Sequence, residues 1–342
     1  MRAVVCPEYG PPEVVRIEER PSPLPGPGQV RVRVRAASVN FPDVLLTAGS
    51  YQISVPPPFV PGSEYAGVVE AVGDGVDALA VGDLVTSTGL IGAFAEEVVA
   101  DAAKLTPVPA GVDPRVAAAF GVAHRTAFHT LRSVARIGAG DDLIVLGAGG
   151  GVGLAAVQLG VALGASVTAV ASSADKLDVA ASYGATHLVN HRDGDLRDAL
   201  RRALPDGAHA VIDPVGGDLA EPALRTLRRG GRFVTVGYAS GVIPKIPLNL
   251  VLVKGIHILG FQFQDIPADE YLRNERELTE LLVAGRVTPH IGASFPLDKA
   301  ADALRHVADG RAVGKVLLDI APGAGGTSSS LRTNPGTSPG FP

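Results

Sequence analysis

A glycine-rich turn at residues 147–153 is the stretch of this sequence whose chemistry is most direct. An apolar run at 143–146 precedes it, and small and apolar residues at 152–163 continue from it with helical character. Glycine permits a tight strand-to-helix turn and lets a pyrophosphate approach the N–H groups at the positive end of a helix. The turn predicts a dinucleotide site; a flexible glycine loop is disfavoured because a second strand follows at the right distance. The residues expected to line the site are Gly147, Gly150, Gly151, Val152 and Gly153.

The end of the second strand indicates which dinucleotide is bound. An NAD site usually has an acidic residue about 20 residues after the glycines, which accepts from the ribose 2′-hydroxyl. Here Ser172 and Ser173 end the strand, and Lys176 lies one turn into the next helix. Small hydroxyls and a cation favour a 2′-phosphate, so the sequence predicts NADP(H). The alternatives are helix capping by the serines, a solvated Lys176 and a ribose contact from Asp175.

Two further glycine-containing loops, at 213–217 (DPVGG) and 237–241 (GYASG), follow strands of the same predicted sheet. Ligands of open α/β sheets lie at the carboxyl ends of the strands, so these loops are expected to border a nicotinamide. For any single residue, a role in an ordinary connecting loop is an equally good interpretation. The residues assigned to this border are Asp213, Val215, Gly237 and Tyr238.

The composition limits the kinds of partner. The formal net charge of −5 argues against nucleic acid or an anionic membrane surface as the main partner. No apolar run approaches the roughly 18 residues of a membrane span, and the start MRAVVCPEYG lacks a signal-peptide pattern, so a cytoplasmic protein is expected. The single cysteine, Cys6, excludes an internal disulfide framework and a multi-cysteine zinc site, and no metal site is predicted.

The elements that must position these residues change character near residue 114. Before it, short strands alternate with Pro and Gly turns; at 29–36 valines and arginines alternate strictly, which predicts a half-buried strand with solvated arginines. A helix is predicted at 116–132, after which strands and helices alternate, as in a parallel sheet with right-handed crossovers. The predicted strands of this sheet are 143–146, 166–171, 187–190, 210–213, 232–236 and 256–260.

The last part of the chain predicts helices at 269–284 and 297–309 and strands at 291–295 and 315–320. Residues 321–342 are rich in Gly, Ser, Thr and Pro and are predicted to be a disordered tail or an extension without function. The apolar strand at 256–261 is expected at the edge of the sheet. Because an exposed apolar edge is a liability unless it is paired, a homodimer is predicted.

Several segments, in order, resemble the medium-chain dehydrogenase/reductase superfamily and specifically its zinc-free NADPH:quinone oxidoreductase branch. They are Asn40-Phe41-Pro42-Asp43, Gly49-Ser50-Tyr51, 61–69 (PGSEYAGVV), the turn at 147–153, 213–217 and Gly314-Lys315-Val316. The likeness covers residues 1–320 and implies an α/β protein with two domains. A GroES-like β-barrel catalytic domain (1–122) would be followed by a Rossmann domain with a doubly wound parallel sheet (123–263) and completed by 264–320.

The resemblance also implies chemistry without zinc. Zinc alcohol dehydrogenases have Cys and His at the positions of Asn40 and Ser63, so the Lewis acid that polarises an alcohol oxygen is missing. A quinone or an α,β-unsaturated carbonyl stabilises negative charge by conjugation and needs only hydrogen-bond donors. Tyr51 is the first choice for such a donor and for proton delivery; the alternative is an ordinary aromatic residue of the barrel.

The remaining site residues also follow from the resemblance. Asn40 and Asp43 are expected to shape the cleft, with turn or helix-cap chemistry as the alternative. Thr126 matches a position near the nicotinamide, and a bond back to its own helix is the alternative. His191 replaces a Tyr that often contacts the cofactor, although a surface His is an alternative. The other residues assigned to the cofactor are Phe261 and Lys315.

Together these observations predict an NADPH-dependent reductase that transfers hydride directly to a quinone or a related small conjugated carbonyl compound. A close alternative is the reduction of an enone or an enoyl thioester such as acryloyl-CoA. An alternative from another class is a non-catalytic NADPH-binding sensor or structural protein; retention of Asn40, Asp43 and Tyr51 favours catalysis.

Overall fold

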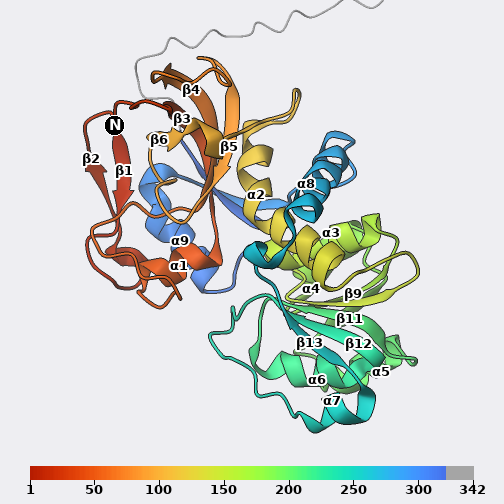
Figure 1. Cartoon of the computed structure of the whole chain (residues 1–342). Helices are drawn as coiled ribbons and strands as arrows, with labels where there is room; N and C mark the ends of the chain where they lie inside the picture. The colour runs from red at the N-terminus through yellow and green to blue at the C-terminus, as the bar shows by residue number, and fades with distance from the viewer. Residues whose placement is uncertain (321–342) are drawn as a thin grey trace, which may run out of the picture.

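Two large sheets of different strand geometry dominate the computed structural model, which describes residues 1–320 (Figure 1). The first part of the chain, red to orange in Figure 1, forms an antiparallel barrel-like domain, and the green to cyan part forms a parallel-sheet domain. The long helix α2 (Pro114–His129) lies between them. The predicted tail at 321–342 lies outside the described residues.

The parallel sheet has the strand order β10-β9-β8-β11-β12-β13. Its strands are β8 (Asp142–Leu146), β9 (Ser166–Ala171), β10 (His187–Asn190), β11 (Ala208–Asp213), β12 (Leu227–Thr235) and β13 (His257–Gly260). Its helices are α3 (Gly151–Ala162), α4 (Ala174–Ser182), α5 (Leu196–Ala203), α6 (Ala220–Thr226) and α7 (Asn249–Lys254). The order reverses between β8 and β11, which is where doubly wound sheets bind ligands at their carboxyl ends.

The apolar run of β8 explains why this sheet is covered on both faces. Leu143 and Val145 belong to one buried cluster, whereas Ile144 and Leu146 belong to another. Because successive strand residues point to opposite faces, a continuous apolar run needs helices on both sides. The predicted α/β pattern of this region is confirmed.

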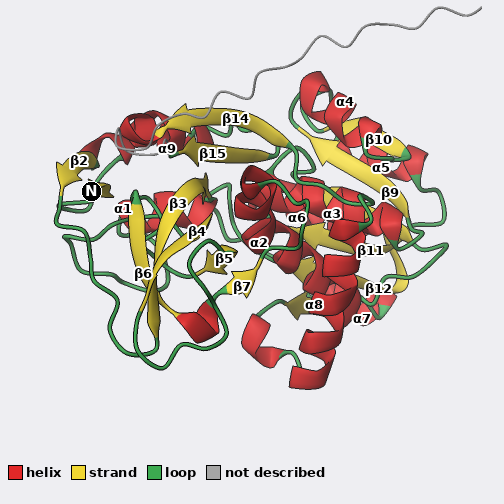
Figure 2. Cartoon of the chain, turned by 90° about the horizontal axis from the view of Figure 1, so that it is seen from above, coloured by secondary structure: helices red, strands yellow, loops and turns green. Residues whose placement is uncertain are grey.

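The barrel-like domain combines segments from both ends of the chain. Its strands are β1 (Arg2–Val5), β2 (Arg16–Glu19), β3 (Gln29–Val39), β4 (Glu64–Val72), β5 (Leu84–Thr88), β6 (Glu97–Asp101), β7 (Thr106–Pro107), β14 (Ile291–Pro296) and β15 (Lys315–Asp319). The large sheet has the order β14-β15-β3-β4-β5-β7, with β6 also paired to β3. Figure 2 shows α9 (Ala300–Ala308) beside β14 and β15, although the other barrel strands come from the start of the chain.

The alternating strand was predicted correctly, but not the surroundings of its arginines. Val30, Val32 and Val34 are buried in β3. Arg33 is mostly covered and pairs with Glu70 of β4 and, at 3.2 Å, with Glu97 of β6. The arginines are therefore not a simple solvated face, because β3 is flanked by strands that supply carboxylates.

Several boundaries differ from prediction. The strand predicted at 232–236 begins earlier, as β12 starts at Leu227, which pairs with Ala208 before a β-bulge. A short helix, α1 (Phe41–Thr47), follows Asn40 with Pro42 in its first turn. The helix predicted at 116–132 is α2 followed by a π-helical turn at Thr130–Val134.

The predicted domain boundaries also differ from the packing. The division between 122 and 123 falls inside α2, which is one continuous helix. The helix α8 (Ala268–Val283), predicted within the barrel completion, instead buries Leu278 and Leu281 in a cluster of the parallel-sheet domain. Its apolar face is therefore covered by the parallel-sheet domain.

Candidate active site at the junction of the two domains

The predicted nucleotide turn joins β8 to α3. Gly147 has a φ of 61°, and a Cβ on Gly153 would lie 2.1 Å from the Gly147 carbonyl oxygen. Gly150 is the N-cap residue of α3, and no side chain caps this helix end. The first N–H groups of α3 therefore face a space without a side-chain cap, which suits a phosphate at the positive end of the helix.

The loops after β11 and β12 lie beside this turn. A Cβ on Gly147 would lie 2.6 Å from Val215, and one on Gly216 would lie 2.9 Å from the Tyr238 ring. Asp213 Oδ1 accepts 2.8 Å hydrogen bonds from the N–H groups of Val215 and Gly216, and burial raises the pKa of Asp213. Asp213 therefore shapes the loop, Val215 lies against Gly147 of the turn, and Tyr238 lies against Gly216. Gly237 begins the second loop, its N–H directed at the Asp213 carbonyl.

Lys176 lies directly over the nucleotide turn. A Cβ on Gly149 would collide with the Lys176 stem at 2.6 Å, and the ammonium donates to the Gly310 carbonyl at 2.6 Å. Burial, together with the nearby Arg192 guanidinium, lowers the pKa of Lys176. Lys176 is thus a partly covered cation at the turn, not a plain solvated helix residue.

The serines and His191 lie around the same position. Ser173 is the N-cap residue of α4, yet its side chain makes no capping hydrogen bond, and Ser172 precedes it at the end of β9. Burial, with Arg192 and Lys176 close by, lowers the pKa of His191. The hydroxyls of Ser172 and Ser173 therefore lie near the end of β9. The imidazole of His191, the guanidinium of Arg192 and the ammonium of Lys176 lie near one another in the same region, where a 2′-phosphate would need hydrogen-bond donors.

On the barrel side, five residues form a buried polar group that we call the Glu64 cluster. Its members are Asn40, Asp43, Ser63, Glu64 and Lys315. Glu64 Oε1 accepts from Lys315 Nζ at 2.8 Å and from Asn40 Nδ2 at 2.9 Å, and Lys315 also donates to Asn40 Oδ1. Glu64 Oε2 accepts from the backbone N–H of Val122 at 2.7 Å. One carboxylate thus joins α1, α2 and β15.

The predicted role of Lys315 at the cofactor changes in this geometry. Its stem passes Gly151, 3.2 Å from where a Cβ would stand, and Gly314 donates to the Gly149 carbonyl at 2.8 Å. The ammonium, however, points into the Glu64 cluster and is almost fully buried. The Lys315 stem therefore packs against the nucleotide turn, and the Lys315 ammonium is paired with the Glu64 carboxylate.

Three other predicted residues lie outside the Glu64 cluster. Tyr51 follows α1 and packs against the barrel core, and the described residues provide no hydrogen bond to its hydroxyl. Thr126 is half-buried in α2, and unlike Thr47, which bonds to the Asp43 carbonyl at 2.9 Å, it does not bond back to its own helix. Phe261 packs edge-on to Phe263 at 4.8 Å.

A second polar network was not predicted. The Glu275 carboxylate of α8 lies 3.0 Å from Arg125 Nε and 2.8 Å from His129 Nε2, both on α2. Despite burial, His129 and Arg125 hold the pKa of Glu275 below its ordinary value. His129 also packs edge-on to Phe263, so the network fixes the segment that carries Phe261. The spacing of Arg125 and His129 on one helix face was the available sequence signal.

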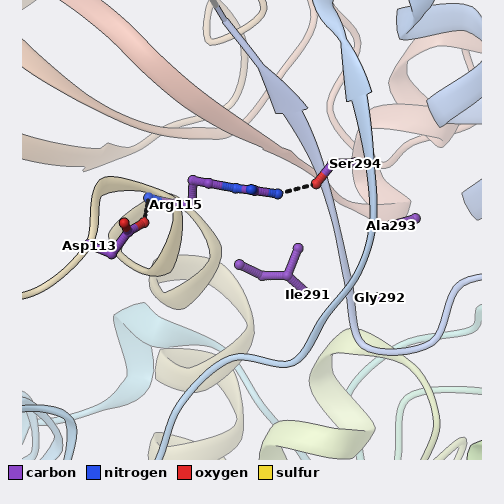
Figure 3. Close-up of a pocket in the computed structure, with 6 residues that line it drawn as sticks. All are labelled: Asp113, Arg115, Ile291, Gly292, Ala293 and Ser294. Atoms are coloured by element: carbon purple, nitrogen blue, oxygen red, sulfur yellow. Dashed lines mark hydrogen bonds between the residues drawn. The ribbon is translucent and has the colours of Figure 1, made fainter. Parts of the chain in front are cut away.

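One surface pocket lies away from these residues (Figure 3). It is lined by Asp113, Arg115 and residues 291–294, and Figure 3 shows Arg115 reaching across to Ser294. The pocket is open to solvent and contains none of the predicted site residues, so we place the chemistry at the nucleotide turn.

Residues 1–320 contain neither a metal-binding cluster nor a membrane-spanning helix. No group of three or more His, Cys, Asp or Glu side chains in this part of the chain could hold a metal ion. Every helix described there is too short or too polar to cross a membrane.

Comparison with known proteins agrees with this architecture. Residues 26–110 match the family described as "Alcohol dehydrogenase GroES-like domain", and residues 151–280 match "Zinc-binding dehydrogenase". Quinone oxidoreductase-like protein 2 of Bos taurus is 36% identical over 326 residues, 93% of this chain and 92% of that protein. Human quinone oxidoreductase is 32% identical over 322 residues, 93% of this chain and 97% of that protein.

A solved structure extends the likeness to three dimensions. Escherichia coli quinone oxidoreductase, determined in complex with NADPH, has a TM-score of 0.86 and 28% identity and covers 93% of this chain and 100% of its own. The order of the strands, the nucleotide turn and these relatives agree. The chain belongs to the medium-chain dehydrogenase/reductase superfamily of oxidoreductases, in its quinone oxidoreductase branch.

Proposed function

We propose that this protein is an NADPH-dependent reductase of quinones or related conjugated carbonyl compounds that transfers hydride directly and without zinc. The observation that carries the proposal is that Lys315 runs from the uncapped nucleotide turn into the buried Glu64 cluster, where it meets Asn40 and Asn40 meets Ser63. Relatives named quinone oxidoreductase support the same acceptor class.

The residues around the turn fit NADP(H). The lack of a Cβ at Gly149 and Gly151 lets the Lys176 and Lys315 stems lie against the turn, and the α3 N-terminus can hold the pyrophosphate. Ser172, Ser173 and Lys176 would hold the 2′-phosphate. When bound, the reduced nicotinamide supplies a hydride. The E. coli relative was solved with NADPH, which supports this cofactor.

The acceptor side supplies hydrogen-bond donors instead of a Lewis acid. The amide of Asn40 and the hydroxyl of Ser63 are poor substitutes for the Cys and His ligands of the zinc branch. A conjugated acceptor spreads the arriving negative charge, so hydroxyl donors are sufficient to stabilise it. Tyr51 is proposed as a donor that orients the acceptor oxygen.

The test is turnover with purified protein. NADPH oxidation should be observed with at least one member of a panel of quinones, enones and enoyl thioesters such as acryloyl-CoA, and the preferred member identifies the acceptor class. Activity on enoyl thioesters alone would favour the alternative reductase. NADPH binding without oxidation by any acceptor would favour a non-catalytic binding protein.

The homodimer is proposed on the edge strand of the parallel sheet. β13 is the last strand in the order, and apolar side chains near it are exposed, with Leu248 73%, Leu252 85% and Ile258 38% accessible. Pairing of two β13 strands across a two-fold axis would cover this edge. Light scattering should give twice the chain mass; a monomer at all concentrations would contradict the dimer.

A further inference from the structure

Asn40 has no donor left for a substrate. Its Nδ2 group donates to Ser63 Oγ at 3.1 Å and to Glu64 Oε1 at 2.9 Å, and its Oδ1 accepts from Lys315. A side-chain amide has two N–H hydrogens, so both are used. Ser63 Oγ accepts from Asn40 and keeps its own O–H. Of the amide of Asn40 and the hydroxyl of Ser63, the two uncharged side chains of the Glu64 cluster that could face an acceptor, only Ser63 can therefore still donate.

Asp43 lies behind Ser63 with an incompletely bonded carboxyl group. Asp43 is fully buried, whereas Ser63 and Asn40 each expose 7% of their surface. Its Oδ2 accepts from the Asn40 backbone N–H at 2.7 Å, and its buried Oδ1 has no hydrogen bond. The Ser63 hydroxyl is close enough to favour the Asp43 carboxylate, although it is not at hydrogen-bonding geometry. A rotation of the Ser63 side chain would complete this contact.

The charges around Asp43 keep a proton available. Burial raises the pKa of Asp43 to about 7, opposed by the Asn40 N–H and the Ser63 hydroxyl. Glu64 of β4 raises this pKa further, whereas the Lys315 ammonium of β15 lowers it. Asp43 is consequently a neutral acid in a substantial fraction of molecules near pH 7, and Lys315 can stabilise the carboxylate that remains after proton loss.

We propose that Ser63 donates the proton to the acceptor oxygen and that Asp43 replaces the proton on Ser63. This inference rests on the proposed function and moves proton delivery from Tyr51 to Ser63, leaving Tyr51 to orient the acceptor. A hydroxyl backed by a carboxylic acid then acts in place of a metal ion. Asp43 reaches the acceptor only through Ser63.

Atoms and charges balance in this step. The acceptor gains a hydride, and negative charge develops on its conjugated oxygen. The Ser63 O–H bond breaks as the acceptor O–H bond forms, and the Asp43 proton moves to Ser63 Oγ. The products are the reduced acceptor, the oxidised cofactor and the Asp43 carboxylate. After the product leaves, Asp43 regains a proton from solvent by way of Ser63.

The kinetic test uses Ser63→Ala, Ser63→Thr and Asp43→Asn with a quinone acceptor, from about pH 5.5 to about pH 9. The wild-type rate should fall as the pH rises through about 7, where Asp43 loses its proton. Ser63→Ala should lower turnover by roughly 100-fold and Ser63→Thr should restore most of it. Asp43→Asn should lower turnover and remove the inflection near neutral pH. NADPH affinity, measured by fluorescence, should be unchanged in all three variants. Unchanged affinity also serves as the control that the variants fold.

An activity-independent measurement separates this inference from the proposed function. In infrared spectra of the protein without cofactor, the C=O band of a protonated carboxylic acid should titrate near pH 7 and be absent from Asp43→Asn. No such band at pH 6 would overturn the role of Asp43 even if quinones are reduced. Ser63→Ala turnover within twofold of wild type would overturn the role of Ser63. If no acceptor is reduced, the proposed function fails while the band still tests Asp43.

Discussion

The nucleotide half and the acceptor half of the site treat their polar groups in opposite ways. At the nucleotide turn, α3 has no side-chain cap, Ser173 does not cap α4, and the Lys176 ammonium contacts a backbone carbonyl. In the Glu64 cluster, Glu64 and Lys315 are buried and bonded to each other and to Asn40. One half keeps its donors for a ligand, and the other satisfies its charges internally.

The difference follows from the ligands that each half would receive. A dinucleotide phosphate brings negative charge, so open donors at the turn gain partners when it binds. A neutral conjugated acceptor brings no charge to offset a buried ion, and an unpaired Glu64 or Lys315 would be costly. The acceptor half therefore depends on internal ion pairing and hydrogen bonding for its stability. Four substitutions test this difference between the two halves.

The largest effect is expected from Lys315→Met. This substitution leaves Glu64 buried without its cation and should lower the free energy of unfolding by about 3–5 kcal/mol, measured by urea denaturation without cofactor. Lys176→Met is the matched control and should cost less than about 1 kcal/mol, because its ammonium has only the Gly310 carbonyl to lose. Equal losses in the two variants would remove the distinction between the halves.

A smaller effect is expected from Asp43→Asn on the pH dependence of stability. In the folded protein Asp43 ionises near pH 7 instead of at its ordinary pKa of 3.8, so its stabilising contribution is complete at low pH and is lost as the pH rises through 7. Between pH 5 and pH 8, wild type should lose about 2–3 kcal/mol relative to Asp43→Asn. His124, whose pKa burial lowers to about 3, gives an opposite trend below pH 6.5 that is common to both proteins. Parallel stability curves would contradict the buried neutral Asp43.

Lys176→Ala tests the nucleotide half. Loss of the ammonium should weaken NADPH binding by roughly tenfold and change NADH binding by less than about twofold, because only NADPH carries the 2′-phosphate. Isothermal titration measures both. Lys299→Ala, on an exposed residue paired with Asp302, is the control and should change neither. Equal weakening of NADPH and NADH would disprove the phosphate assignment.

The smallest effect is expected from Tyr51→Phe. Removal of one neutral hydrogen bond to the acceptor should lower turnover by roughly two- to tenfold and leave NADPH affinity unchanged. Tyr9→Phe is the control, since the Tyr9 hydroxyl donates to the Val55 carbonyl at 2.8 Å on the same barrel. Unchanged turnover in Tyr51→Phe would exclude a role for this hydroxyl.

The same contrast explains what could be predicted from the sequence. The nucleotide half is encoded in local patterns: an apolar strand, glycines at fixed spacing and Lys176 shortly after the next strand. The structure places these elements together at the carboxyl end of β8, at the reversal of strand order. Short-range spacing is sufficient here because consecutive βα units pack side by side.

The acceptor half depends on distant pairs that no local pattern reveals. Glu64 and Lys315 are 251 residues apart, and Glu64 also bonds to the backbone of Val122. The available signal was a charged residue at the start of a mainly apolar strand, since such residues are rarely buried without a partner. Amphipathic periodicity predicted the helix α8 but not which domain would cover its apolar face.

The late position of β15 also determines when the chain can complete its barrel during synthesis. β3 pairs with β15 from Val39 to Ala36, and Glu64 receives its cation from the same late strand. Residues leave the ribosome in order. The edge of β3 therefore lacks its β15 partner, and the Glu64 carboxylate lacks Lys315, until the whole nucleotide domain has been synthesised. The barrel therefore cannot be the first unit to mature, and its final hydrogen bonds form only after Lys315–Asp319 has emerged.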